Sequence, residues 1–177
     1  VNGPIVQGAG ADVVQISGGQ AGSISQGAGI DRFSMSAGTI ASLAQGDGHD
    51  IFAMSGGTIT GAFEDGDEAL MSGGTIGRVD MKLDNNLFDM RGGTIVNNLV
   101  TGFGDDTILV SGTSYIGGNI STSGGADIIT ISGGTVNGQI LASFGNDAFS
   151  WIGGGRINSA VLLGADNDTA LLQNLTE

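Results

Sequence analysis

A motif of the form Gly-x-Gly-x-Asp returns along the whole chain at nearly constant intervals, and this repeat limits the fold more than any other feature. Its last position is occupied by Asp12, Asp31, Asp50, Asp67, Asn86, Asp106, Asp127, Asp147 and Asp168. The intervals between them are 19, 19, 17, 19, 20, 21, 20 and 21 residues. Periods of about 20 residues are typical of solenoids, in which each repeat is one coil of a stack.

Within each repeat, apolar residues alternate with polar ones, which predicts short strands buried on one face. The second and fourth residues after the motif are apolar, as in Phe33 and Met35. A corner such as SGG follows, because glycine allows the positive φ of a sharp turn. A second strand then directs Ile40, Ile59, Ile76, Ile95, Ile116, Val136 and Ile157 inward, and a third directs Ile24, Leu43, Val79, Leu99, Ile120, Ile140 and Val161 inward.

These repeats predict an all-β fold: a right-handed parallel β-helix, or solenoid, of about nine coils of 17–21 residues with three short strands per coil. One coil cannot bury its apolar face, but coils stacked at strand spacing can, with like residues over one another. We expect the Gly and Asp columns to follow the outside corners. Residues 1–177 are expected to form one domain whose two ends are cut from a longer solenoid, because neither end carries a polar cap.

Composition excludes several classes of function. Five basic residues face eighteen acidic ones, for a net charge of -13, so the long-range field repels nucleic acids and anionic membrane surfaces. We therefore expect no nucleic-acid partner. The chain has no cysteine, which excludes a disulfide framework, a zinc-thiolate site and a thiol nucleophile.

The corner motifs resemble a known family. They read MSAGTI (35–40), MSGGTI (54–59 and 71–76), MRGGTI (90–95) and ISGGTV (131–136). Glycine-rich coils of this kind, in an acidic chain without cysteine, resemble the passenger domains of autotransporters, the type V secretion proteins of Gram-negative bacteria. The resemblance covers essentially the whole chain, but such motifs identify an architecture better than an activity.

The autotransporter resemblance implies a location and a role. It implies export through the inner membrane and passage through an outer-membrane barrel formed by a C-terminal segment outside this sequence, which would be the only contact with a membrane. The passenger would then be secreted or displayed at the cell surface. Passengers of this type mostly act as non-enzymatic adhesins, autoaggregation factors or virulence factors that bind host receptors, and one pro-angiogenic group mimics a growth factor. The implied partner is a host cell-surface protein or a second copy of the chain.

The repeated Asp also invites comparison with the calcium-binding RTX nonapeptide, which GAGADVVQI (8–16) and GDGHDIFAM (46–54) match in most positions. The RTX motif recurs every nine residues, whereas here the motif occurs once per coil and the opposing SGG corner has no carboxylate. We therefore expect each Asp to form a turn and cap nearby backbone N–H groups. No metal and no cofactor are predicted, with an RTX-like, calcium-stabilised structural rod as the alternative.

Residues for catalysis are scarce. The single histidine, His49, occupies a variable position beside a corner, where a surface role is expected, while a Ser-His-Asp triad would need it buried and oriented. The aromatic residues Phe33, Phe52, Phe88, Phe149 and Trp151 fall on inward columns and not on a sugar-binding platform. We predict no catalytic residue, with a polysaccharide-active β-helix enzyme as the alternative from another class.

Candidate partner-binding residues lie where the repeat is broken, because a local departure from a regular pattern often marks function. The segment FEDGDE (63–68) shortens its coil to 17 residues, Arg91 replaces a corner serine, and Tyr115 lies in an insertion. The candidates are Glu64, Asp65, Asp67, Glu68, Arg78, Lys82, Arg91 and Tyr115. A charged patch of this kind orients a partner and speeds association, although a solvated corner with weak ion pairs is the simpler interpretation.

Overall fold

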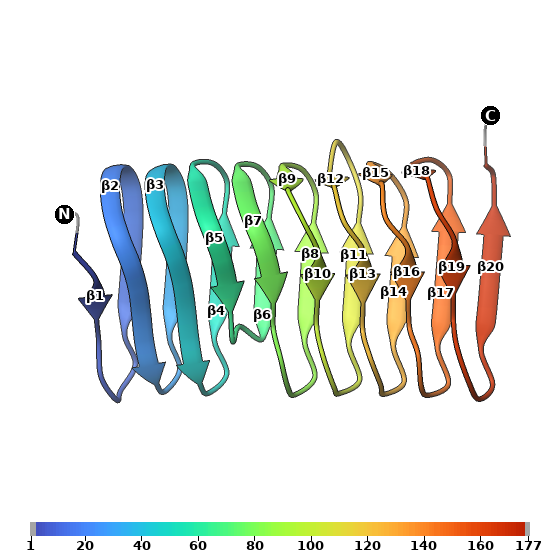
Figure 1. Ribbon diagram of the computed structural model, residues 1–177, viewed down its shortest axis with the longest axis horizontal. Helices are drawn as coiled ribbons and strands as arrows, with labels where there is room; N and C mark the ends of the chain where they lie inside the picture. Colours follow the sequence, from blue (N-terminus) through green and yellow to red (C-terminus); the bar gives the residue numbers. More distant parts are fainter. Residues whose placement is uncertain (1–2, 176–177) are drawn as a thin grey trace.

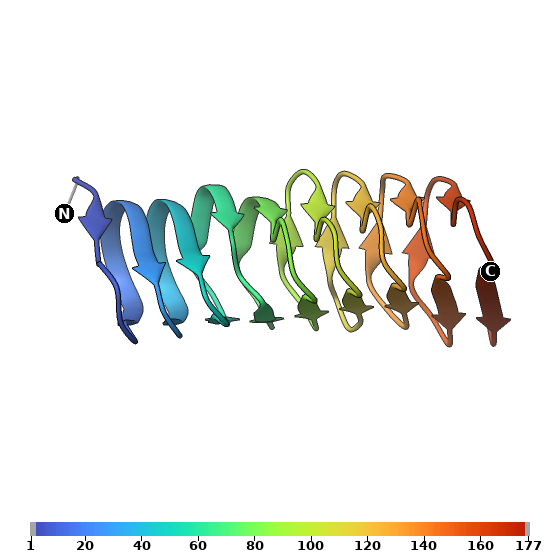
Figure 2. The same ribbon diagram turned by 90° about the horizontal axis from the view of Figure 1, so that it is seen from below.

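A computed structural model describes residues 3–175. It shows an all-β parallel solenoid of about nine turns with no helix among these residues. The coils lie side by side along one axis, with the first and last described coils at opposite ends (Figures 1 and 2). No helix in the described part of the chain is long and apolar enough to cross a membrane.

Three columns of parallel strands form the three faces of the solenoid. The first column contains the start of β2 (Val13–Ala28) and of β3 (Arg32–Asp47), then β4 (Ile51–Met54), β6 (Glu68–Met71), β8 (Leu87–Met90), β11 (Thr107–Val110), β14 (Ile128–Ile131), β17 (Ala148–Ile152) and β20 (Thr169–Gln173). The second contains the middle of β2 and β3, the start of β5 (Thr58–Glu64) and of β7 (Thr75–Asp80), then β9 (Thr94–Ile95), β12 (Tyr115–Ile116), β15 (Thr135–Val136) and β18 (Arg156–Ile157). The third contains β1 (Ile5–Val6), the ends of β2, β3, β5 and β7, then β10 (Leu99–Val100), β13 (Ile120–Ser121), β16 (Ile140–Leu141) and β19 (Val161–Leu162).

Strand length changes along the solenoid. The prediction of three short strands per coil holds from β8 onward, where each face has its own strand. In the first coils, β2 and β3 each run for 16 residues around two corners, and their pairing shifts register at Ile16 and Ser17. Backbone pairing between neighbouring coils therefore continues around the N-terminal corners and is interrupted at the later corners.

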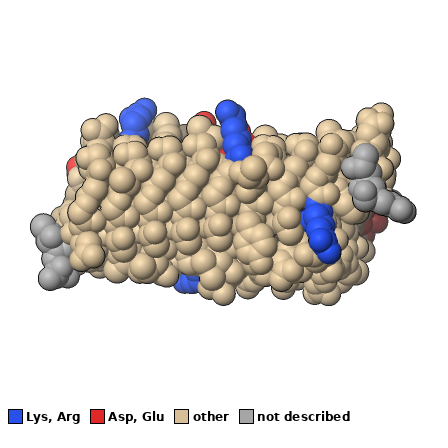
Figure 3. All heavy atoms as spheres, turned by 90° about the horizontal axis from the view of Figure 1, so that it is seen from above, with Lys and Arg blue, Asp and Glu red and all other residues tan. Residues whose placement is uncertain are grey.

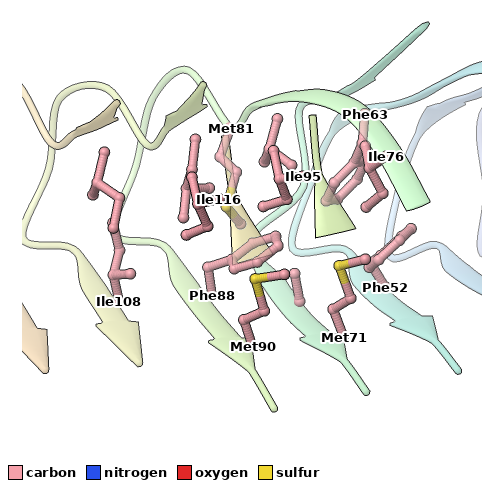
Figure 4. Close-up of a cluster of buried hydrophobic side chains, with 14 of the residues drawn as sticks. Phe52, Phe63, Met71, Ile76, Met81, Phe88, Met90, Ile95, Ile108 and Ile116 are labelled. Atoms are coloured by element: carbon pink, nitrogen blue, oxygen red, sulfur yellow. The ribbon is translucent and has the colours of Figure 1, made fainter. Parts of the chain in front are cut away.

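The predicted inward ladders form the core. In the middle coils, the apolar residues of all three columns are buried, and like residues lie over one another, as Ile76, Ile95 and Ile116 do (Figure 4). Phe63, which the repeat analysis did not assign, fills the third column and stacks on Phe52 with ring centroids 4.2 Å apart. The stacking of coils, and not any single coil, therefore excludes water from the interior.

The column of motif aspartates departs from the prediction. We expected these residues on outside corners, but Asp31, Asp50, Asp106, Asp127 and Asp147 are buried. The backbone is already extended at the motif, so alternation places each Asp on the same face as the apolar residues two and four positions later. The aspartates therefore form a polar edge of the core.

Candidate functional site

The buried aspartates form a hydrogen-bonded ladder that joins neighbouring coils. The N–H of Asp31 donates to the carboxylate of Asp50 at 2.8 Å, and the N–H of Asp106 donates to Asp127 at 2.9 Å. The same bond recurs at Asp12, Asp50, Asn86, Asp127 and Asp147. The predicted role in capping backbone N–H groups is therefore correct, but the bond runs to the preceding coil and not within the turn.

Asn86 divides this ladder into two runs of acids. Its side-chain amide donates to the carbonyls of Leu83, Asp84 and Thr101 at 3.1–3.2 Å. Within the described residues, no hydrogen bond joins the N–H of Asp67 to Asn86, so the coil-to-coil series stops at this one step. A neutral side chain at this rung separates the negative charges on its two sides.

Burial perturbs the acids of the ladder. Desolvation, with smaller contributions from the carboxylates of Asp31 and Asp67, raises the pKa of Asp50 to about 6 against the opposing effect of the hydrogen bond from the Asp31 N–H. Desolvation also raises the pKa of Asp127 to about 6, against the opposing effects of the nearby Thr122 hydroxyl and of the hydrogen bond from the Asp106 N–H. At Asp50 and Asp127, burial therefore disfavours the charged form more than the hydrogen bonds stabilise it.

The ladder does not resemble a calcium site. Among residues 3–175, no group of three or more His, Cys, Asp or Glu side chains is arranged to hold a metal ion. No coil contributes more than one motif carboxylate, Asn86 contributes none, and one oxygen of carboxylates such as Asp50 and Asp147 already accepts a backbone N–H. Calcium requires six to eight oxygen ligands around one point, which a single file of carboxylates does not supply.

The shortened coil leaves a hollow in the row of motif corners. Ala44 pairs with Glu64, and the next motif positions are Asp50 and Asp67, so the corner is three residues shorter in this coil. Figure 1 shows the turn between β5 and β6 set back from the turns on either side. The hollow, which we call the corner notch, has a volume of about 370 Å³ and is lined by Asp47, Asp65, Asp67, Lys82 and Asp84.

Four of the predicted charged residues meet beside the corner notch. Lys82 donates to Asp65 at 2.8 Å and lies 3.8 Å from Glu64, which also pairs with Arg78. The hydrogen bond to Asp65 raises the pKa of Lys82. Arg78 reaches Asp80 at 3.0 Å. These side chains are 27–46% exposed, so solvent screens their pairs and the pairs add little stability, but they hold a defined charge pattern at the surface.

The remaining candidates lie elsewhere. Asp67 is 8% exposed and belongs to the buried ladder, while Glu68 is exposed at the start of β6. Arg91 lies at an SGG corner and pairs with Asp89 at 2.6 Å. Tyr115 is 42% exposed on β12. The structure therefore separates Arg91 and Tyr115 from the charged residues beside the notch.

The sequence repeat did not predict the exposure of three apolar residues on the motif corners. Leu83, Phe103 and Phe144 are 62%, 63% and 67% exposed, and each occupies the third position before the motif Asp or Asn in its corner. The one signal in the sequence was this shared position, which alternation within strands does not cover. His49 is exposed beside a corner, as expected.

Two of the three rows of corners, the SGG corners and the motif corners, differ in charge. The face made by the SGG corners is almost free of acidic side chains, with a few scattered basic ones (Figure 3). Exposed acids such as Asp47, Asp84, Asp105 and Asp166 lie on the motif corners instead. The solenoid thus has one nearly neutral edge and one acidic edge.

Comparison with models of known protein families, with curated proteins and with solved structures finds no match to this chain.

Proposed function

We propose that this solenoid is a non-enzymatic binding rod, exported to the bacterial surface or secreted as an autotransporter passenger, which binds a host cell-surface protein along its side. The family assignment rests on the resemblance of the SGGT motifs, and the coarser architecture of about nine parallel coils agrees with it. A rod whose interior is filled by its own ladders leaves only its outer surface for recognition.

The observation that carries the proposal is the corner notch. Regular coils present nearly identical corners. A partner that binds at one position must therefore recognise a feature that the other corners lack. The notch interrupts the row of corners and is bordered by Glu64, Asp65, Arg78 and Lys82 in mutual ion pairs. Charges fixed in this way orient an approaching partner and affect the rate of association more than its final affinity.

Binding of the purified chain to cultured epithelial and endothelial cells tests the proposal. We expect saturable binding that is reduced by the charge reversals Glu64→Lys and Asp65→Lys made together. Asp166→Lys, which reverses an exposed acid at a distant motif corner, is the control and should leave binding unchanged. Absence of saturable binding to any cell type, or equal loss with the control, would contradict the proposal.

Self-association is the other partner that the resemblance implies. Sedimentation of the chain over a range of concentrations distinguishes it, because a rod that binds only host proteins remains monomeric. A monomer–dimer equilibrium abolished by the Glu64 and Asp65 reversals would assign the notch to contacts between copies.

A further inference from the structure

An exposed apolar stripe begins at Leu83, which lines the corner notch, and continues toward the C-terminal coils. It consists of Leu83, Phe103 and Phe144, whose side chains are each more than three-fifths exposed. Backbone bridges join Phe103 to Gly124 and Gly124 to Phe144, so the two rings lie on one column with a glycine rung between them. Two rungs correspond to about 10 Å.

Gly124 forms the floor between the two rings. A Cβ atom at this position would lie 3.4 Å from Cδ1 of Phe103, so the Phe103 ring leans over the glycine. Phe144 pairs in turn with Ala165, which continues the column, and its side chain is 67% exposed. The chain contains only seven phenylalanines, and exposing two of them on one column of an acidic rod is unfavourable in water.

Acidic side chains follow the apolar stripe. Asp84 and Asp105 are exposed beside Leu83 and Phe103. The lining of the notch holds Asp47, Asp65 and Asp84 together with Lys82, which pairs with Asp65 at 2.8 Å. The surface around the stripe therefore has a surplus of negative charge that favours a cationic partner.

We propose that the apolar stripe binds a segment of a protein partner in which lysine or arginine side chains accompany apolar ones. The apolar side chains cover Phe103 and Phe144, and the basic side chains meet Asp84 and Asp105. Aromatic side chains are typical anchors of protein interfaces, and they are commonly surrounded by a polar rim. Here the rim is acidic and would attract basic side chains of the partner. The inference rests on the proposed binding function and specifies the chemistry of the partner.

Synthetic peptides test the stripe directly. The probe is a short peptide in which lysines alternate with leucines, compared with peptides in which glutamate replaces lysine or serine replaces leucine. We expect the full chain to bind the Lys-Leu peptide in fluorescence anisotropy and to bind the other two much more weakly. Equal binding of the Lys-Ser peptide would show charge attraction alone and overturn the role of the stripe.

Variants locate the binding. Phe103→Ser with Phe144→Ser should weaken binding of the Lys-Leu peptide by about tenfold or more. Ile128→Ser, which removes an apolar side chain 48% exposed on β14, is the matched control. Because these side chains point into solvent and not into the core, circular dichroism should show unchanged folding. A loss of affinity equal to that of the control would refute the proposal.

Removing the acidic charges beside the stripe tests their role in binding independently of the phenylalanines. Asp84→Asn with Asp105→Asn removes two charges and keeps the side-chain oxygen of residue 105 that accepts the Ala126 N–H at 2.7 Å. The variant should bind the Lys-Leu peptide more weakly and with less dependence on salt. Unchanged affinity and salt dependence would contradict the expected role of the two acids.

Two outcomes separate this inference from its premise. If the chain binds cells and the phenylalanine double variant binds them equally well, the proposed role of the stripe is wrong, while the proposed binding function still holds. If no cell binding occurs but the peptide binds at the stripe, the proposed function fails alone. Tighter binding of a neutral cello-oligosaccharide than of the Lys-Leu peptide, lost in the phenylalanine variant, would replace the protein partner by a glycan.

Discussion

The buried aspartate ladder predicts that the solenoid loses stability as the pH rises from the acidic range to neutrality. Burial raises the pKa of Asp127 from 3.8 to about 6, so the folded state binds more protons than the unfolded state between these values. A shift of this size corresponds to about 3 kcal/mol. This contribution is fully present below about pH 4 and is lost as the pH rises through about 6.

The substitution Asp127→Asn isolates this effect. Asparagine keeps an oxygen for the N–H of Asp106, which now donates to Asp127 at 2.9 Å. Asn86 shows how the new amide group is satisfied at this corner, because it donates to carbonyls two and three residues before it and to one in the next coil. At residue 127, the equivalent carbonyls are those of Gly125, Gly124 and Ala142. The variant therefore removes the buried charge without creating a buried donor that has no acceptor.

We expect Asp127→Asn to be more stable than the parent by about 3 kcal/mol at about pH 8 and nearly equal to it at about pH 3. Urea unfolding at a series of pH values measures the difference. Glu68→Gln is the control, because it removes one exposed charge outside the ladder and should change stability little at either pH. Asp127→Ala should instead destabilise the fold by about 1–3 kcal/mol at acidic pH, since the buried N–H of Asp106 loses its acceptor.

A parent protein whose stability rises from pH 4 to pH 7 would refute this reasoning. So would an Asp127→Asn variant that is less stable than the parent at neutral pH. Either result would mean that the carboxylates are stabilised as anions inside the solenoid, by partners or ions that outweigh desolvation.

Two sets of substitutions test the packing of the coils, and added calcium tests for a metal site. Phe52→Ala, which removes a buried ring stacked 4.2 Å from Phe63, should lower the free energy of unfolding in urea by about 3–5 kcal/mol; a loss below about 1 kcal/mol would show that the site is loosely packed. Gly48→Ala should destabilise far more than Gly10→Ala, because both glycines have positive φ but only at Gly48 would a Cβ atom collide with a neighbouring coil, 1.6 Å from the oxygen of Gly29; similar melting temperatures would contradict the close approach. Millimolar calcium should not raise the melting temperature, since the described residues include no group of three acidic or His side chains arranged for a metal and a ligand of the folded state would stabilise it.

The interior of the solenoid could be predicted from the sequence because every coil repeats the same pattern of apolar residues. The same alternation recurs in coil after coil, so an error at one position is corrected by the others. Ile40, Ile76 and Ile116 are all buried as expected. At the ends this logic weakens, and Leu172 is exposed because no described coil lies over it.

The direction of the motif aspartates was predicted wrongly because the motif was treated as a corner separate from the strand. Counting back by two from Met35 gives Phe33 and then Asp31, so alternation alone places Asp31 inside. The expectation that charged residues face water overrode this pattern. Inside the solenoid, the cost of burial is offset by the coil-to-coil N–H bond and by a raised pKa.

The corner notch and the apolar stripe depend on three-dimensional relations that one coil does not reveal. The short interval before Asp67 marked a departure, but the sequence does not show that the missing residues come from the corner. That follows from the pairing of Ala44 with Glu64. Phe103 and Phe144 lie outside the strands, where no alternation rule predicts the direction of a side chain.

Distances between spin labels along one outward column test the stacking of coils most directly, because the chain has no cysteine of its own. Ser34 shares such a column with Thr130, Ser150 and Leu171, which lie five, six and seven rungs away by strand pairing. Pairs of introduced cysteines at Ser34 and each of these positions should give distances near 24, 29 and 34 Å, an increase of about 4.8 Å per rung. Distances that do not grow steadily with each added coil would contradict the solenoid.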